Sequence, residues 1–214
     1  IKDRFPDISI FQIDSDKVKT DKSARSIIQK FRSRPGSILL GTEMIFQYLH
    51  EKVENSAIIS LDSLFSLPDF RIHEKILYIL IRMRSITTKH FIVQTRKPDE
   101  KVFEYGLKGN LSDFYREEIN ERKKFNYPPF MNLIKITLEG KKDKIINEMT
   151  EIQNILDPFE IEVFPAFTHT LRGNFVLHGL IKIDNNDKNI AEIKDKIRFL
   201  PLSTIIKVDP ETLL

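Results

Sequence analysis

Two short apolar runs, each ending in small or polar residues, constrain the fold of this sequence more than any other feature. The run Ile38-Leu39-Leu40 ends at Gly41-Thr42, and a second run at residues 57–61 ends at Asp62. Apolar runs of this length that stop at such residues are typical of central strands in a parallel sheet. Because functional groups collect beyond the carboxyl ends of such strands, we expect Thr42 and Asp62 to stand at the tips of neighbouring strands.

Patterns typical of strands and helices alternate along the first half of the chain. Strand-like runs occur at residues 8–13 and 90–95. Apolar residues recur at helical spacing over residues 24–31 and 76–83, with Asp21 as the expected N-cap of the first helix. Strands and helices that alternate at short spacing predict an α/β lobe built on a parallel sheet.

A polar helix separates the first half from the second. It is expected to begin at Asn110 or Ser112, one of which caps it. It must end before Tyr127-Pro128-Pro129-Phe130, because proline removes a helical donor and restricts the residue before it. We place a domain boundary inside this helix, which divides the chain into residues 1–117 and residues 118–214.

The second half has a different rhythm. Ile134, Ile136 and Leu138 alternate with polar residues, which predicts a half-buried strand. The patterns that follow predict, in order, a helix, two strands, a helix and a last strand ending at Val208. The order β-α-β-β-α-β predicts a small ferredoxin-like α+β domain.

Composition and charge exclude several classes of protein. Hydrophobic residues make up 41% of the chain and charged residues 30%, and no apolar run approaches the ~18 residues of a membrane span. The first residues are charged rather than apolar, so we expect a cytoplasmic protein. Cysteine is absent and the five histidines are scattered, so we expect no disulfide and no metal site. A net charge of +3 permits a polyanionic partner without requiring one.

Several motifs occur together in one order and spacing. They are Ile38-Leu39-Leu40-Gly41-Thr42-Glu43-Met44, Leu67-Pro68-Asp69-Phe70-Arg71, Val93-Gln94-Thr95, Glu118 with Glu121-Arg122, and Tyr127-Pro128-Pro129-Phe130. Leu171-Arg172-Gly173 and the terminal residues 208–214 close the series. In these motifs the chain resembles the primosomal protein N′ (PriA) family of bacterial replication-restart DNA helicases, along that family's second motor lobe and C-terminal domain.

The resemblance implies a RecA-like parallel-sheet helicase lobe followed by the small ferredoxin-like domain. It implies replication restart, in which branched DNA is bound without sequence preference and unwound 3′ to 5′ with ATP. Implied partners are branched or single-stranded DNA, the single-strand DNA-binding protein and primosome proteins. The family's ATP, Mg²⁺ and zinc sites lie upstream of the matched segment. Because this chain has neither a phosphate-binding loop nor cysteine, we expect no cofactor and no catalytic residue in it.

The sequence departs from the family pattern where the motor needs arginine. The family has a Gln-x-x-Gly-Arg-x-Gly-Arg run whose arginines reach the γ-phosphate of ATP. This chain has Arg82 in place of the glutamine, Ile86 in place of the first arginine and Lys89 near the second. Lysine does not replace a planar, bidentate guanidinium at such a site. Glu43 also replaces a glutamine, and two arginines and a tryptophan are missing from the run that follows Arg172. We therefore expect this lobe not to support ATP hydrolysis, even when it is joined to an intact first lobe.

Residues at the expected strand tips and in the basic clusters are the candidates for binding. The candidate DNA contacts are Thr42, Arg71, Arg122, Lys123, Lys124 and Arg172. The candidate nucleotide-facing residues are Gly41, Asp69 and Lys89. Three simpler interpretations stay open. Arg71 forms a local ion pair with Asp69 or Glu74, the cations at residues 122–124 complement the dipole of their helix, and Asp14 with Asp16 forms a turn rather than a metal site.

Three functions remain open at this point. The first is the C-terminal part of a replication-restart helicase, and the second is a catalytically inactive, helicase-like scaffold that binds DNA or replication proteins. The third is an unrelated stand-alone α/β module. Binding to forked DNA with a steep salt dependence separates the first two from the third. ATP hydrolysis by the full-length protein separates the first from the second.

Overall fold

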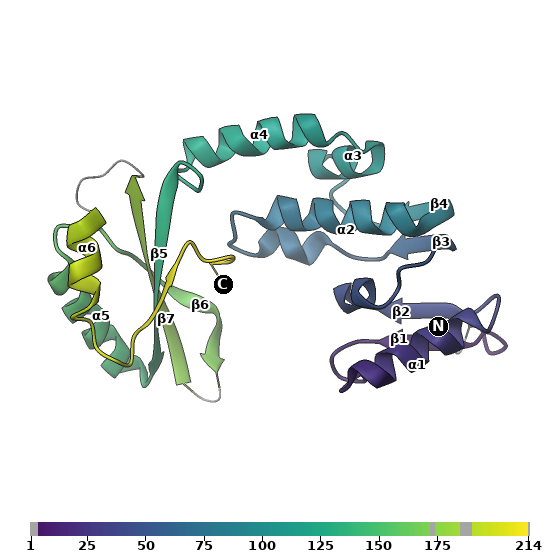
Figure 1. Ribbon diagram of the computed structural model, residues 1–214, viewed down its shortest axis with the longest axis horizontal. Coiled ribbons are helices and arrows are strands. Elements are labelled where there is room, and N and C mark those ends of the chain that lie inside the picture. Colours follow the sequence, from purple (N-terminus) through teal and green to yellow (C-terminus); the bar gives the residue numbers. More distant parts are fainter. Residues whose placement is uncertain (1–3, 172–173, 185–189, 214) are drawn as a thin grey trace. The chain divides into compact units, whose positions relative to one another are not determined.

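The computed structural model describes residues 4–171, 174–184 and 190–213 (Figure 1). The chain folds into two compact units. The first unit comprises Ile1–Ser60 with Leu77–Thr95, and the second comprises Leu61–Ile76 with Arg96–Leu214. The expected boundary between residues 117 and 118 falls inside a helix of the second unit, and this division of the chain stays a prediction.

The first unit alternates strands and helices. Its elements are β1 (Ile10–Ile13), α1 (Asp21–Arg32), β2 (Ile38–Gly41), the 3-10 helix η1 (Glu43–Gln47), β3 (Val53–Ile58), most of α2 (Ile72–Ile86) and β4 (Thr87–Val93). Strand β1 pairs in parallel with β2, and β3 pairs in parallel with β4. The prediction of an α/β fold with parallel strands is therefore confirmed.

The prediction that the segments ending at Thr42 and Asp62 are neighbouring strands is wrong. Strand β2 pairs with β1 and strand β3 pairs with β4, so the four strands form two separate two-stranded sheets. Strand β3 ends at Ile58, and the residues up to Asp62 lead into the 3-10 helix η2 (Asp62–Ser66) instead of extending the strand. Strand β3 begins before the apolar run of residues 57–61, because the polar residues before that run pair with β4. An apolar pattern does not reveal this pairing.

The core of the first unit lies between α1, β1 and the end of α2. It contains the buried residues Ile13, Val18, Ala24, Ile28, Leu49 and Ile86. Thr20, rather than the expected Asp21, caps α1, because the Thr20 side chain accepts a hydrogen bond from the backbone N–H of Ser23 at 3.2 Å. Asp21 occupies the first helical turn, where its carboxylate pairs with Arg25 at 2.8 Å. A threonine directly before an acidic residue therefore indicates this N-cap better than the acidic residue itself does.

The second unit contains a four-stranded antiparallel sheet. Its elements are η2, the start of α2, α3 (Lys101–Lys108), α4 (Leu111–Lys124), β5 (Met131–Gly140), α5 (Lys142–Leu156), β6 (Glu162–Leu171), β7 (Asn174–Asp184), α6 (Ile190–Ile197) and β8 (Ile205–Val208). The strand order is β6-β7-β5-β8, and every neighbouring pair is antiparallel. Together with the β-α-β-β-α-β sequence from β5 onward, this order confirms the ferredoxin-like prediction.

The two faces of this sheet have different partners. Helices α5 and α6 lie on one face (Figure 1), where Ile136 and Leu138 pack with Met149 and Ile152 of α5. The opposite face was expected to be open to solvent, but Lys135 on that face is only 5% exposed. The half-buried prediction for β5 is therefore wrong, because segments from elsewhere in the second unit cover its polar side.

Two helices, α3 and α4, lie between β4 and β5 in the sequence. Helix α4 was predicted and helix α3 was not. Asn110 caps α4 as expected, since its side chain accepts a hydrogen bond from the N–H of Asp113. Helix α3 was missed, although Gly109, at φ +76°, closes it in the left-handed conformation that glycine adopts readily. Among the described residues, no helix is both long and apolar enough to span a membrane.

Candidate nucleic-acid interface

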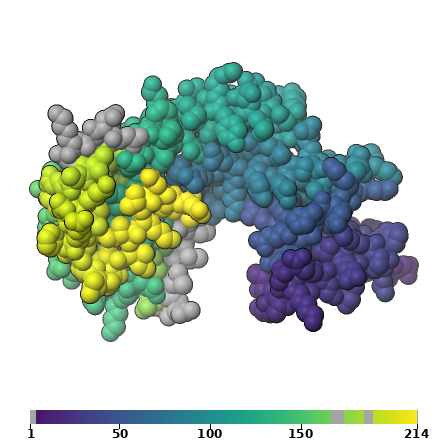
Figure 2. All heavy atoms as spheres, viewed as in Figure 1, coloured from purple at the N-terminus to yellow at the C-terminus, as the bar shows by residue number. Residues whose placement is uncertain are grey.

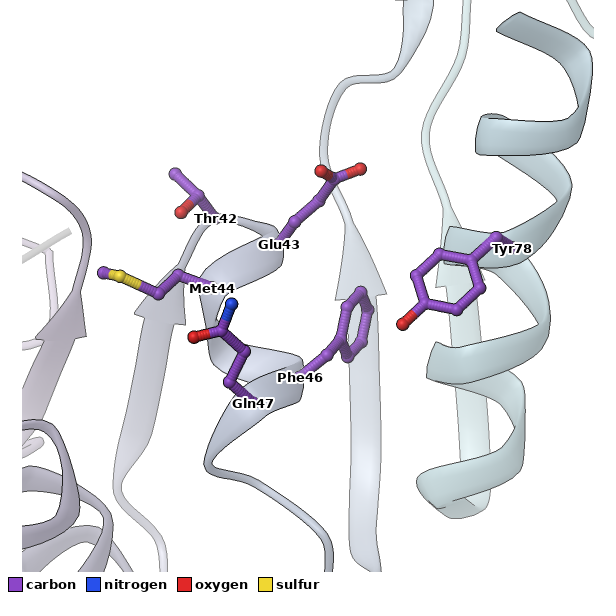
Figure 3. A pocket seen from close by; sticks show the side chains of 6 residues that line it. All are labelled: Thr42, Glu43, Met44, Phe46, Gln47 and Tyr78. Atoms are coloured by element: carbon purple, nitrogen blue, oxygen red, sulfur yellow. The ribbon is translucent and has the colours of Figure 1, made fainter. Parts of the chain in front are cut away.

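An open pocket of about 590 Å³ lies at the carboxyl end of β2, within the first unit (Figure 3). Its lining residues are Thr42, Glu43, Met44, Phe46, Gln47 and Tyr78. Thr42 is exposed and directly precedes η1, and its side chain makes no capping hydrogen bond. The structure thus places Thr42 at an accessible rim, and contact between Thr42 and DNA stays a prediction.

Gly41, the residue before this rim, is held in a close approach to β1. A Cβ atom on Gly41 would lie 2.7 Å from the carbonyl oxygen of Ile13 and 2.8 Å from Cδ1 of Ile45. The glycine is therefore explained by packing between the strand end and η1. A nucleotide-facing role for Gly41 stays a prediction.

The segment of residues 62–71 belongs to the second unit and is held by hydrogen bonds at both ends. The Asp62 carboxylate accepts a hydrogen bond from the N–H of Arg96 at 2.8 Å. The Asp69 carboxylate accepts one from the backbone N–H of Arg71 at 3.0 Å and another from the Thr212 hydroxyl. The Asp62 carboxylate therefore holds the backbone at Arg96, and the Asp69 carboxylate holds a turn and a contact with Thr212.

Phe70, next to Asp69, is enclosed by aromatic and apolar side chains. Its ring stacks on Tyr127 with a centroid distance of 4.8 Å and an interplanar angle of 12°. Both rings pack against a cluster on the sheet face opposite α5 and α6 that includes Leu133 and Leu213. Figure 2 shows the residues toward the C-terminus, in yellow, on the surface of the second unit, to which they belong. The segment of residues 67–71 is thus docked on the ferredoxin-like sheet.

Arg71 does not make the side-chain ion pair that the simpler interpretation proposed. Glu74 pairs with Arg122 instead, at 2.9 Å. The Arg71 guanidinium lies 5.2 Å from the centroid of the Phe70 ring, and its Nε is buried without a hydrogen-bond partner in the described part of the chain. Contact between Arg71 and DNA stays a prediction.

Arg122 is held inside the second unit. Its side chain is 11% exposed, and its guanidinium lies 2.9 Å from both Glu118 and Glu74. It also donates a hydrogen bond to the carbonyl oxygen of Pro128 at 3.3 Å. These contacts argue against Arg122 as a phosphate contact, although its neighbours Lys123 and Lys124 are exposed at the end of α4.

Glu118, the partner of Arg122, is one of the buried ionisable groups of this unit. It is 6% exposed, and burial raises the pKa of its carboxyl group while the Arg122 charge opposes that shift. His73 and Glu121 approach Glu118, so that potential ligand atoms of the three side chains lie within 4.8 Å of one another. No spacing in the sequence groups His73 with these carboxylates. Because Glu118 already pairs with Arg122, we do not interpret the cluster as a metal site.

The run that replaces the family's arginines is part of a helix and a strand. Ile86 is the last residue of α2 and is 5% exposed, and β4 begins at the next residue, Thr87. Lys89 lies on β4, where it pairs with Glu54 at 2.9 Å. The structure therefore contains no loop between α2 and β4, and a nucleotide-facing role for Lys89 stays a prediction.

Two candidates remain, Arg172 and the pair of Asp14 and Asp16. Arg172 lies outside the described residues, so its predicted DNA contact is not tested. Asp14 accepts hydrogen bonds from the N–H groups of Asp16, at 3.1 Å, and Lys17, at 2.8 Å. The hydrogen bond from Lys17 is the largest cause of the lowered pKa of Asp14. This geometry is that of a turn, as the simpler interpretation of Asp14 predicted.

Sequence reasoning missed the aromatic pair at the pocket. Phe46 is 7% exposed and Tyr78 is 53% exposed, and their rings meet edge to face at a centroid distance of 6.2 Å. Tyr78 lies outside the apolar stripe of α2, so an aromatic residue on the polar side of a helix was the available signal. The pairing with Phe46 depends on the tertiary fold.

These observations define a class: an α/β protein in which a unit of parallel strands is combined with a ferredoxin-like unit. No family model matches the chain. Replication restart protein PriA of Chlamydia muridarum is 33% identical over 233 residues, which cover 99% of this chain and 30% of the relative. The protein of the same name from Thermotoga maritima is 27% identical over 225 residues, covering 100% of this chain and 30% of the relative. The one from Bacillus subtilis is 25% identical over 215 residues, covering 98% of this chain and 24% of the relative.

The resemblance found in the motifs is therefore confirmed: over nearly its whole length, the chain is similar to part of replication restart protein PriA. The chain spans about 30% of the length of the first of these relatives.

Proposed function

We propose that this chain is the C-terminal part of a PriA-like replication-restart DNA helicase. In this proposal, residues 1–117 correspond to the second motor lobe and residues 118–214 to the C-terminal domain. The observation that carries the proposal is the match, over nearly the whole chain, to proteins named for replication restart. The part contributes binding of branched DNA and primosome assembly, and it does not hydrolyse ATP by itself, because it has no phosphate-binding loop.

The proposed DNA contacts are the predicted residues other than Arg122. They are Thr42 at the pocket rim, Lys123 and Lys124 at the end of α4, and the untested Arg71 and Arg172. Arg122 is left out because its charge is matched by two carboxylates within the fold. Lysine contacts to phosphate release counterions, so they add affinity that falls with salt and carries no sequence preference.

Binding to forked DNA tests this proposal. The chain is expected to bind a fork and a single strand, with an affinity that falls steeply as salt rises. Replacing Lys123 and Lys124 together by glutamine should weaken binding and reduce the salt slope by roughly one unit for each phosphate that is no longer neutralised. Lys144→Gln, at an exposed lysine of α5, is the matched control and should leave binding unchanged. No binding to any DNA at low salt contradicts the proposal.

The second candidate function is a catalytically inactive, helicase-like scaffold that binds DNA or replication proteins. A specific observation favours it, since the position aligned with the first of the family's arginines is the buried Ile86, in the core of the first unit. Lys89, near the second arginine, is paired with Glu54. Neither side chain offers the fixed guanidinium that stabilises charge in phosphoryl transfer. We expect the full-length protein to show no DNA-stimulated ATP hydrolysis, and robust DNA-dependent turnover would refute the scaffold.

Protein partners are a further part of the proposal. The single-strand DNA-binding protein and primosome proteins are the expected partners, on the basis of the family alone. Each purified candidate protein is mixed with this chain, with and without forked DNA. Whether the two then co-purify tests whether the candidate binds this chain directly.

A further inference from the structure

The exposed side of helix α4 has aromatic and apolar side chains where a solvated helix would have polar ones. Leu111, Tyr115 and Ile119 are 41%, 51% and 41% exposed. They recur every four residues, so they form one row along the helix. The residues of α4 that the fold buries are Phe114 and Glu118. A surface helix needs only its buried side to be apolar, so the packing of α4 does not explain the exposed row.

A second row, of polar and basic side chains, lies next to the apolar one. Arg116, Asn120 and Lys123 are exposed and follow one another at spacings of four and three residues. The two rows lie side by side for about 10 Å along the helix axis. Arg116 pairs with Asp113 at 2.9 Å, in an exposed pair that adds little stability, whereas Lys123 forms no ion pair with any described residue. This side of α4 therefore has two positive charges against one negative charge.

The Tyr115 ring is held in place although it is exposed. The ring of the buried Phe114 meets it edge to face, at a centroid distance of 5.4 Å and an interplanar angle of 76°. Phe114 in turn meets the ring of Tyr105, in α3, edge to face at 6.0 Å. A ring that is braced in this way and open to solvent loses little conformational entropy when a flat group stacks on it.

A single strand of nucleic acid carries the groups that match both rows. Its bases stack on aromatic side chains, and its phosphates attract lysine and arginine. The row of Tyr115 and Ile119 offers a stacking ring with an apolar neighbour, and the next row offers Lys123 and Arg116 to the phosphates. An apolar protein surface would match the first row alone. Every nucleotide carries both a flat base and a negative charge, so charge complementarity favours a single strand.

We propose that this side of α4 binds single-stranded DNA, with one base stacked on Tyr115 and the adjacent phosphates at Lys123 and Arg116. The inference rests on the proposed function and deepens it, because it takes DNA as the partner and names one place where a base is held. Stacking of this kind does not read the sequence, since every base has a flat face.

The sequence contains no tryptophan, so a single one can be introduced as a reporter. Tyr115→Trp keeps an aromatic ring on this side of α4, and a base that stacks on the indole quenches its fluorescence. We expect oligothymidine to quench the emission, and an abasic strand with the same number of phosphates to bind without quenching it. Phe199→Trp is the matched control, because Phe199 is a 79% exposed aromatic residue elsewhere in the second unit. Its emission should change with neither strand.

Affinities measured by fluorescence anisotropy of labelled strands separate stacking from charge. Tyr115→Ala should weaken binding of oligothymidine about tenfold and leave binding of the abasic strand unchanged. Tyr115→Phe should bind like the wild type because it keeps the ring, and Tyr115→Leu should bind like Tyr115→Ala because it is apolar without a ring. The loss in Tyr115→Ala should be similar at low and high salt, whereas Lys123→Gln should reduce the salt slope by about 0.7 unit.

The outcomes distinguish this inference from the proposed function. If the chain binds both strands and Tyr115→Ala changes neither affinity, the site on α4 is overturned and the proposed DNA binding stands. The site is also overturned if Tyr115→Ala weakens both strands equally, because Tyr115 then supports the fold rather than a base. If Tyr115→Ala changes neither affinity but abolishes co-purification with a replication protein, this side of α4 binds protein instead of DNA. Binding of neither strand by the wild type overturns both the inference and the proposed function.

Discussion

Two polar segments in the first half of the sequence have different surroundings in the folded chain. Residues 42–47 border an open pocket, with Thr42 and Glu43 exposed. Residues 67–71 are docked on the ferredoxin-like sheet, where Phe70 stacks on Tyr127 and Asp69 is bound by Thr212. Both segments match family motifs and both looked like functional edges in the sequence. In the first segment Thr42 lies exposed at the pocket rim, whereas in the second the Phe70 ring and the Asp69 carboxylate have partners within the fold.

The difference between the two segments arises from the partners that reach them. The segment of residues 67–71 is enclosed by Leu133 of β5 and by Leu213 near the end of the chain. The carbonyl oxygen of Leu213 in turn accepts a hydrogen bond from the buried Lys135 at 2.9 Å, and burial is the main cause of the lowered pKa of Lys135. A polar motif therefore indicates a binding edge only where no later part of the chain covers it.

The largest expected effect concerns the buried charge beside the enclosed segment. Glu118→Gln removes the carboxylate that pairs with Arg122, leaving a largely buried guanidinium with Glu74 alone. We expect a loss of about 3 kcal/mol in the free energy of unfolding, measured by urea denaturation. Glu104→Gln, in the exposed pair with Lys108, is the control and should have almost no effect. Equal effects of the two changes would show that the Arg122 network does not support the enclosed segment.

The second prediction compares Phe70, in the segment packed on the sheet, with Tyr78, at the open pocket. Phe70→Ala removes a stacked ring packed against the sheet and should cost about 2–3 kcal/mol. Tyr78→Ala removes an exposed ring at the open pocket and should cost less than about 1 kcal/mol. Urea denaturation of both variants measures the difference. If Tyr78→Ala proves the more destabilising change, the assignment of the open and enclosed segments is reversed.

The smallest effect is a pH dependence of the sheet that carries the enclosed segment. His178 is 5% exposed, its Nδ1 lies 2.9 Å from the Thr137 hydroxyl, and burial, followed by the charge of Lys135, lowers its pKa to about 4. In the unfolded chain the pKa is about 6.5, so between these values the unfolded state binds more protons than the folded state. Stability should therefore fall as the pH is lowered, by about 2 kcal/mol from pH 7 to pH 5.

Denaturation of the wild type and of His178→Gln at a series of pH values measures this contribution. The variant lacks the titrating ring, so its stability should change less over that pH interval. The pKa of Glu118, raised by burial, acts in the opposite direction in both proteins and cancels from their difference. A wild type and a variant with parallel pH profiles would show that His178 is not held neutral by the fold.

Local patterns predicted much of the fold and little of the candidate site. The ferredoxin-like order and the Asn110 cap were predicted correctly, because each depends on residues close together in the sequence. Among the candidates, Thr42 lies at the rim of a pocket that the sequence did not predict, whereas Arg122 is paired within its own unit. The pairing of Arg122 with Glu74 joins residues far apart in the sequence, and the spacing of charges along one helix does not reveal it.

What the sequence determined by itself was the class of fold, the resemblance to replication restart protein PriA and the absence of a phosphate-binding motif from these residues, since each depends on the order of nearby residues. Only the tertiary structure decided which polar residues stay open to a ligand. The buried Lys135 donates to Leu213, 78 positions later, and Thr212 binds Asp69 across 143 positions. Burial of a polar group requires partners that replace water, and those partners are brought together by the folded chain rather than by neighbouring residues.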